Sequence, residues 1–180
     1  GGIIGCAIAY HLAKRGETDI VLLERANLTE GATWHAAGLV GQLRSSRNTT
    51  RMLKKSVEMY DKLQNEEGFQ FDWKKTGSLR LASSKERLLE AKRLATMARS
   101  FDLEMLIISP QEAKELFPLI EENGLHGAAF IPSDGYVDPS ALCSAIANAA
   151  RKYGAQINQN IALLDFITND RRIKEVKTSN

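Results

Sequence analysis

The stretch GGIIGCAIAYHLAKRGETDIVLLE, residues 1–24, reads as a glycine-rich turn followed by a helix and a strand. Ile4, Ile8 and Leu12 recur every four residues, which is the spacing of one face of an α-helix. Gly16 is expected to end this helix because glycine readily adopts a positive φ. The apolar run DIVLLE that closes the stretch favours a strand buried on both faces of a parallel sheet.

This order matches most of a dinucleotide-binding fingerprint, G-x-G-x-x-G followed by an acidic residue about 20 positions later. Gly2 and Gly5 fit the second and third glycines, which places the first glycine before residue 1. Gly2 would let the backbone approach a pyrophosphate, and Gly5 would let the helix pack closely on the strand. The helix N-terminus would bind the phosphates, and Glu24 would accept hydrogen bonds from ribose hydroxyls. The alternative is a structural turn followed by a surface glutamate.

A carboxylate at this place disfavours a 2′-phosphate, which favours FAD or NAD over NADP. Arg25, directly after Glu24, is the one residue nearby that argues the other way.

The composition is that of an ordinary globular protein, with 43% hydrophobic and 26% charged residues among 180. The net charge is only +2 and no basic block stands out, so nucleic acid and acidic membranes are not expected partners. The longest apolar run, residues 3–10, is far shorter than the roughly 20 residues of a membrane span. No metal-ligand cluster is present. Cys6 and Cys143 are expected to be buried, reduced thiols of an intracellular protein, and the alternative is a disulfide.

Four further helices are predicted from hydrophobic spacing and capping signals. They are marked by Leu53, Val57, Tyr60 and Leu63; by Ser83 and Glu86 as a capping box ahead of Leu88, Ala91, Ala95 and Ala98; by Ser109, Pro110 and Glu112; and by Asp138 and Pro139, with Gly154 as the end. The carboxylates of SDGYVDP, residues 133–139, are expected to be turn and cap residues instead of a catalytic pair.

Strands are predicted at residues 77–83, 104–109, 127–132, 161–167 and 172–178. The first three look antiparallel and one-sided, unlike the parallel strand near the N-terminus. The order of elements therefore predicts two interleaved domains with boundaries at 1–72, 73–137 and 138–180.

The segment ERANLTEGATWHAAGLVGQLR, residues 24–44, resembles the FAD-dependent amine dehydrogenases related to dimethylglycine and sarcosine dehydrogenases, within the D-amino-acid-oxidase superfamily. The similarity continues through residues 74–82, 109–120 and 127–142, in the family's order. The resemblance implies an α/β fold, incomplete at both ends. A Rossmann-like FAD-binding domain, a parallel sheet with helices, would be interleaved with a mixed α+β substrate domain that holds residues 73–137.

The run TWHAAGL is the most specific part of the resemblance, which implies covalent attachment of FAD to His35. Imidazole is a nucleophile near neutral pH and can bond to the methyl carbon at the benzenoid edge of the flavin. Composition alone favours a buried histidine that is hydrogen-bonded to backbone. The predicted cofactor-contacting residues are Gly2, Gly5, Glu24, Arg25, Thr33, His35, Ala36, Ala37, Gly38 and Leu39.

The resemblance implies oxidation of an N-methylated amine of the sarcosine or dimethylglycine type by hydride transfer to flavin, giving an iminium and then formaldehyde. The alternatives are a non-catalytic relative similar to the pyruvate dehydrogenase phosphatase regulatory subunit, and an NAD-linked dehydrogenase. A fragment that is inactive alone is expected, with catalytic residues beyond position 180. Tetrahydrofolate is an expected partner of the full-length protein only, and the electron acceptor stays open. The expected location is the bacterial cytoplasm, or the mitochondrial matrix for a eukaryotic protein.

Overall fold

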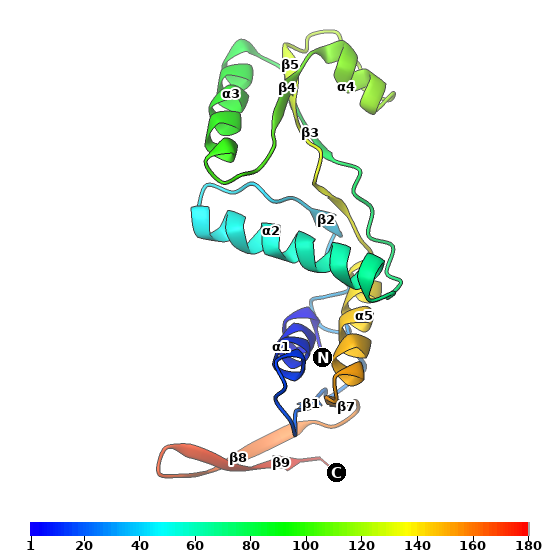
Figure 1. Cartoon of the computed structure of the whole chain (residues 1–180), viewed down its shortest axis with the longest axis vertical. Helices are drawn as coiled ribbons and strands as arrows, with labels where there is room; N and C mark the ends of the chain where they lie inside the picture. Colours follow the sequence, from blue (N-terminus) through cyan, green and yellow to red (C-terminus); the bar gives the residue numbers. More distant parts are fainter. Residues whose placement is uncertain (180) are drawn as a thin grey trace. The chain divides into compact units, whose positions relative to one another are not determined.

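The computed structural model describes residues 1–179 and divides into two compact units (Figure 1). Unit 1 contains residues 1–38, 63–72 and the chain from Val137 onward, and unit 2 contains residues 39–62 and 73–136. The chain passes between the units after residues 38, 62, 72 and 136, so residues 39–62 belong to unit 2. The reason is that β2 (Leu39–Val40) pairs with β6 (Gly135–Tyr136) of the same unit.

Unit 1 is built around two helices and a parallel strand pair (Figure 1). α1 (Ile3–Lys14) packs against α5 (Pro139–Lys152), and β1 (Val21–Leu23) pairs in parallel with β7 (Gln156–Asn158). The predicted end of α1 is confirmed, since Gly16 has a φ of +90°. The cap of α5 is confirmed as well, since Asp138 accepts the Ala141 N–H at 2.7 Å.

The buried face of α1 differs from the predicted one. Ile4, Ile8 and Leu12 are exposed, and the helix buries Cys6, Ala9, Tyr10 and Ala13. Small side chains let α1 approach α5 closely, so they replace the larger residues at the contact.

The strand β1 is parallel as predicted, but it is not buried on both faces. Val21 is exposed, because the parallel sheet of the described residues has only the two strands β1 and β7.

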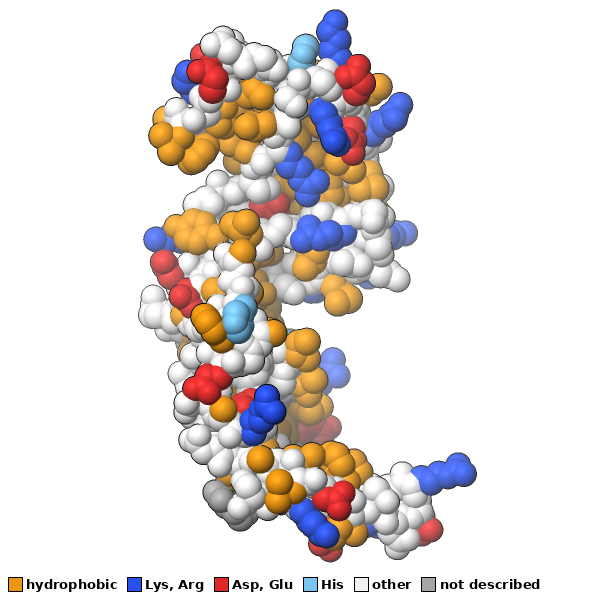
Figure 2. All heavy atoms as spheres, turned by 180° about the vertical axis from the view of Figure 1, so that it is seen from behind, with side chains coloured by type: hydrophobic (Ala, Val, Ile, Leu, Met, Phe, Trp, Pro, Cys, Tyr) orange, Lys and Arg blue, Asp and Glu red, His pale blue; other side chains and the backbone are white. Residues whose placement is uncertain are grey.

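The last two strands of unit 1 form a hairpin as predicted. β8 (Leu163–Asn169) and β9 (Arg172–Thr178) are antiparallel, and the turn between them has positive φ at Asp170 and Arg171. Figure 2 shows hydrophobic side chains on the surface of this hairpin, among charged ones.

Unit 2 contains a three-stranded antiparallel sheet in the order β3 (Ser78–Ala82), β5 (Gly127–Ile131), β4 (Leu106–Ile108). α3 (Lys85–Arg99) and α4 (Pro110–Leu116) lie on opposite sides of it (Figure 1). Ala129 and Ile131 pack in the cluster that includes α3, and Ala128 packs in the cluster that includes α4. The antiparallel pairing is therefore confirmed, but the one-sided sheet was a wrong prediction, because successive residues of β5 are buried on both faces.

The helices α3 and α4 of unit 2 are capped by serine as predicted, but the cap of α3 is one residue later than predicted. Ser84, and not Ser83, caps α3 by accepting the Arg87 N–H at 3.2 Å. The capping box of Ser109 and Glu112 on α4 is confirmed.

The remaining helix of unit 2, α2 (Arg47–Asp61), begins six residues before Leu53, the first apolar residue used to predict it. α2 begins after its N-cap Ser46, and the chain continues as a π-helix, η1 (Lys62–Glu66). Among residues 1–179, no helix has the length and apolar character needed to cross a membrane.

Asp134 directly follows a turn, in agreement with its prediction as a turn residue, but it also has a structural role. Its side chain is buried and accepts hydrogen bonds from the backbone and side-chain nitrogens of Gln42, each at 3.0 Å, and from the Ser78 hydroxyl at 2.7 Å. A buried carboxylate needs such donors to offset the loss of water. Asp134 is thus a structural link inside unit 2.

Candidate cofactor-binding site

The amino-terminal end of α1 is the centre of the predicted nucleotide site. Gly2 is the N-cap residue, in extended backbone, and it has no side chain with which to cap the helix. The first turn also carries no acidic side chain. The positive end of the helix dipole and the first-turn N–H groups are therefore suited to an anion such as a phosphate.

Thr33 ties the histidine-containing segment to this helix end. Its buried hydroxyl oxygen accepts the Ile3 N–H at 3.0 Å. A Cβ atom on Gly2 would lie 3.0 Å from the same oxygen, which is tighter than most contacts in proteins. A side chain at position 2 would therefore crowd the Thr33 hydroxyl, and Gly2 leaves this helix end open.

Glu24 lies directly after β1, and its carboxylate reaches the glycine-rich turn. Oε1 accepts the Ala26 N–H at 2.9 Å. A carboxylate at this position can accept hydrogen bonds from hydroxyl groups. Arg25, next to it, is exposed.

The two other glycines of the turn have unequal steric demands. A Cβ on Gly1 would lie 2.7 Å from the Glu24 side chain, whereas a Cβ on Gly5 would make an ordinary 3.6 Å contact with Leu22. Gly1 is therefore the glycine at which a side chain would clash with Glu24, although the fingerprint allows any residue at this position. Sequence reasoning missed it because the pattern assigns no role to that residue.

His35 lies on an exposed segment. Its Nδ1 is 3.1 Å from the Gly31 carbonyl oxygen, and its ring lies 3.8 Å, centroid to centroid, from the ring of Trp34. Because a carbonyl oxygen only accepts, this contact needs the proton on Nδ1 and leaves the Nε2 lone pair free. The ring is thus hydrogen-bonded to backbone, as composition suggested, but it is not buried.

The small residues after His35 have different surroundings. Ala36 and Ala37 are exposed. Gly38 has a φ of +74°, and a Cβ there would lie 2.2 Å from the Val137 carbonyl oxygen. The backbone contact with Val137 is by itself enough to require glycine at position 38. Leu39 belongs to unit 2, where it is the first residue of β2 and is highly exposed.

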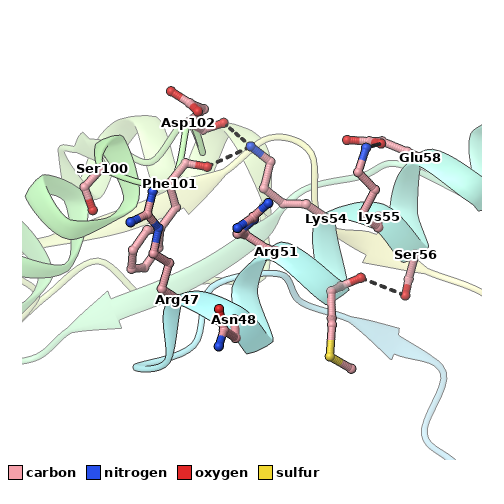
Figure 3. A pocket seen from close by; sticks show the side chains of 11 residues that line it. Arg47, Asn48, Arg51, Lys54, Lys55, Ser56, Glu58, Ser100, Phe101 and Asp102 are labelled. Carbon is pink, nitrogen blue, oxygen red and sulfur yellow. Dashed lines mark hydrogen bonds and ion pairs between the residues drawn. The ribbon is translucent and has the colours of Figure 1, made fainter.

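Unit 2 contains a separate surface hollow of about 890 Å³ along α2 (Figure 3). Arg47, Arg51 and Lys54 line it, and Lys54 donates hydrogen bonds to the carbonyl oxygens of Phe101 and Asp102 at 2.8 and 2.6 Å. None of the predicted cofactor-contacting residues lines this hollow.

The glycine turn, the open end of α1, the parallel strands and the carboxylate after β1 define a nucleotide-binding α/β protein. The model of one family, described as FAD dependent oxidoreductase, matches residues 1–180. The chain therefore belongs to this FAD-dependent family.

Several characterised proteins are similar to the chain. Mitochondrial sarcosine dehydrogenase of Mus musculus is 39% identical over 99% of the chain, and mitochondrial dimethylglycine dehydrogenase of Rattus norvegicus is 41% identical over 86% of it. The mitochondrial pyruvate dehydrogenase phosphatase regulatory subunit of Mus musculus is 35% identical over 99%. The chain spans 18–20% of the length of these relatives.

A solved structure, L-proline dehydrogenase from P. horikoshii, superposes with a TM-score of 0.91 at 34% identity. It is matched over 99% of this chain and 47% of its own. The predicted α/β fold of an FAD-dependent oxidoreductase is thereby confirmed.

Proposed function

We propose that the full-length protein oxidises an N-methyl amino acid of the sarcosine or dimethylglycine type. When bound, FAD would accept hydride from the N-methyl carbon, and water would hydrolyse the resulting substrate iminium to amine and formaldehyde. The similarity to both dehydrogenases over most of the chain supports this substrate class. Oxidation of an amine is favoured over NAD-linked chemistry because the family is FAD-dependent.

The residues at the end of α1 fit the nucleotide part of FAD. The backbone at Gly2 and the first-turn N–H groups would hold the pyrophosphate, and the Glu24 carboxylate would accept hydrogen bonds from ribose hydroxyls. Thr33 would keep its segment beside the phosphates through its hydrogen bond with Ile3.

The exposed His35 ring carries the proposal of a covalent cofactor. The hydrogen bond between Nδ1 and the Gly31 carbonyl orients the ring and leaves Nε2 as the nucleophile. When bound, FAD would be held by a bond from Nε2 to its methyl carbon, formed with loss of one proton and of two electrons that the protein's electron acceptor would take up. Ala36 and Ala37 leave space for a flat ring.

The tether is tested by precipitating the full-length protein with acid and measuring flavin absorbance in the pellet. We expect a yellow pellet from wild type and a colourless one from His35→Ala. The matched control is His11→Ala, which removes another exposed histidine and should leave the colour unchanged. Wild-type flavin found wholly in the supernatant contradicts covalent attachment.

Formaldehyde release distinguishes an enzyme from a regulatory relative. Sarcosine and dimethylglycine are supplied separately with an artificial electron acceptor, and formaldehyde is measured. No formaldehyde from either amine, in a protein that retains flavin, contradicts the proposed activity. Repeating the assay with tetrahydrofolate tests whether the full-length protein captures the one-carbon unit.

A further inference from the structure

Two cysteines that are far apart in the sequence meet at the contact between α1 and α5. Cys6 and Cys143 are both fully buried, and their sulfur atoms lie 3.7 Å apart without a bond between them. Buried, reduced thiols agree with the expectation from the sequence. Contact between the two thiols was not the favoured expectation, because 136 residues separate the two positions.

The two sulfur atoms share polar surroundings. Each lies 3.6 Å from the Gly1 carbonyl oxygen, and the Cys143 thiol is placed to donate to the sulfur of Cys6. The hydrogen bond from Cys143 lowers the pKa of Cys6, although burial acts in the opposite direction. Cys6 is therefore suited to be the thiolate, while Cys143 keeps its proton, because the contact with Cys6 and burial both raise the pKa of Cys143.

We propose that Cys6 and Cys143 form a redox modification site, at which hydrogen peroxide converts the two thiols to a disulfide that joins α1 to α5. The Cys6 thiolate attacks one peroxide oxygen, the O–O bond breaks, and Cys6 becomes a sulfenic acid while water leaves. The sulfur of Cys143 then attacks the sulfur of Cys6, and the hydroxyl of the sulfenic acid leaves as a second water. Both thiols together lose two electrons and the peroxide gains them.

The geometry needs little rearrangement for this step. The sulfur atoms must approach from 3.7 Å to about 2 Å to form the bond. Both residues are enclosed, so a small neutral oxidant is suited to reach them and a larger, charged one is not. A sulfenic acid at Cys6 would form beside Cys143 and would be trapped by it before further oxidation.

The disulfide is tested on the reduced, folded full-length protein. The protein is treated with hydrogen peroxide, remaining thiols are alkylated under denaturing conditions, and the protein is digested without reductant. We expect a cross-linked peptide pair containing Cys6 and Cys143, with the mass of the two peptides less two hydrogens. The pair should disappear after dithiothreitol, and circular dichroism should show that the protein is folded throughout.

Single cysteine variants give the matched controls. In Cys143→Ser, which keeps a hydroxyl to donate to Cys6, dimedone added with denaturant after the peroxide treatment should label Cys6 as a sulfenic acid. In Cys6→Ser it should label Cys143 several-fold less. The wild-type cross-link does not depend on either variant folding. The proposal is overturned if both cysteines are recovered as alkylated thiols at peroxide doses that oxidise glutathione. It is equally overturned if they reach sulfinic acid without a cross-link, or if the cross-link forms only in unfolded protein.

Discussion

The N-termini of α1 and α5 belong to the same unit, but only that of α5 is capped by the side chain of its own N-cap residue. At α5, the Asp138 carboxylate accepts the Ala141 N–H at 2.7 Å, and Pro139 takes the position where no N–H is needed. At α1, Gly2 offers no side chain, and one N–H of the first turn, that of Ile3, is bonded by Thr33 from outside the helix.

The difference separates a helix end that its own side chain caps from one that is proposed to bind a phosphate. A capping carboxylate stabilises a helix by about 1 kcal/mol, and α1 lacks this contribution. It also lacks the negative charge that would repel a phosphate. The comparison therefore predicts that the two ends respond differently to substitution.

The largest effect is expected when the end of α1 is made to resemble that of α5. Gly2→Asp would place a carboxylate where the pyrophosphate is proposed to bind. Two unit charges about 4 Å apart repel by about 4 kcal/mol in a partly exposed site, which corresponds to roughly a 1000-fold loss of FAD affinity. FAD titration followed by flavin fluorescence measures this loss, in a His35→Ala background so that the cofactor can exchange.

Gly2→Ala is the matched control because it adds the same Cβ next to Thr33 without a charge. We expect its FAD affinity to fall much less than that of Gly2→Asp. Equal losses in the two variants would show that crowding at Thr33, and not the open helix end, explains Gly2.

The sequence predicted the elements that local signals define. The ends of α1 and α5, the hairpin of β8 and β9, and the capping box at Ser109 follow from turn and cap chemistry within a few residues. Burial was predicted less well. Ile4 and Ile8 have the right spacing for a core face, but α1 meets α5 through Cys6 and Ala9. Which face of a helix is buried depends on its partner, and spacing does not identify the partner.

The candidate site shows the same limit. Gly2, Glu24 and Thr33 were predicted from motif and resemblance, and the structure brings them to one end of α1. The closeness of Gly1 to Glu24 and the pairing of Cys6 with Cys143 were not predicted. Both are contacts between segments distant in sequence, and no local pattern encodes them.

A second prediction concerns the C-terminal end of α1, where side chains of the helix bind Glu67. The ammonium of Lys14 lies 2.6 Å from the carboxylate of Glu67, and the Tyr10 hydroxyl donates to the same oxygen at 3.1 Å. Glu67→Gln should lower the local stability of α1 by about 1–2 kcal/mol at pH 7, because a charge-assisted bond becomes a neutral one. Amide hydrogen exchange of α1 measures this change, and FAD affinity should stay the same.

The effect of Glu67 should depend on pH. Burial acts to raise its pKa, but the hydrogen bonds from Lys14 and Tyr10 outweigh burial and lower the pKa. A lowered folded-state pKa contributes stability that is fully present above the unfolded value of about 4.3 and is lost as the pH falls through the folded value. Wild type and Glu67→Gln should therefore converge in acid. A difference that persists below the folded-state pKa would show that the ion pair is not its source.

The smallest effect is expected at the closed end of α5. Asp138→Ala removes the bond to the Ala141 N–H and should lower the local stability of α5 by about 1 kcal/mol, again measured by amide hydrogen exchange. Asp138→Ser keeps a capping oxygen without the charge and should restore most of the loss. FAD affinity should change little in either variant, because this helix end is closed by its own side chain. A large loss of FAD affinity in both would mean that the two helix ends are not separate in function, which would remove the basis of the comparison.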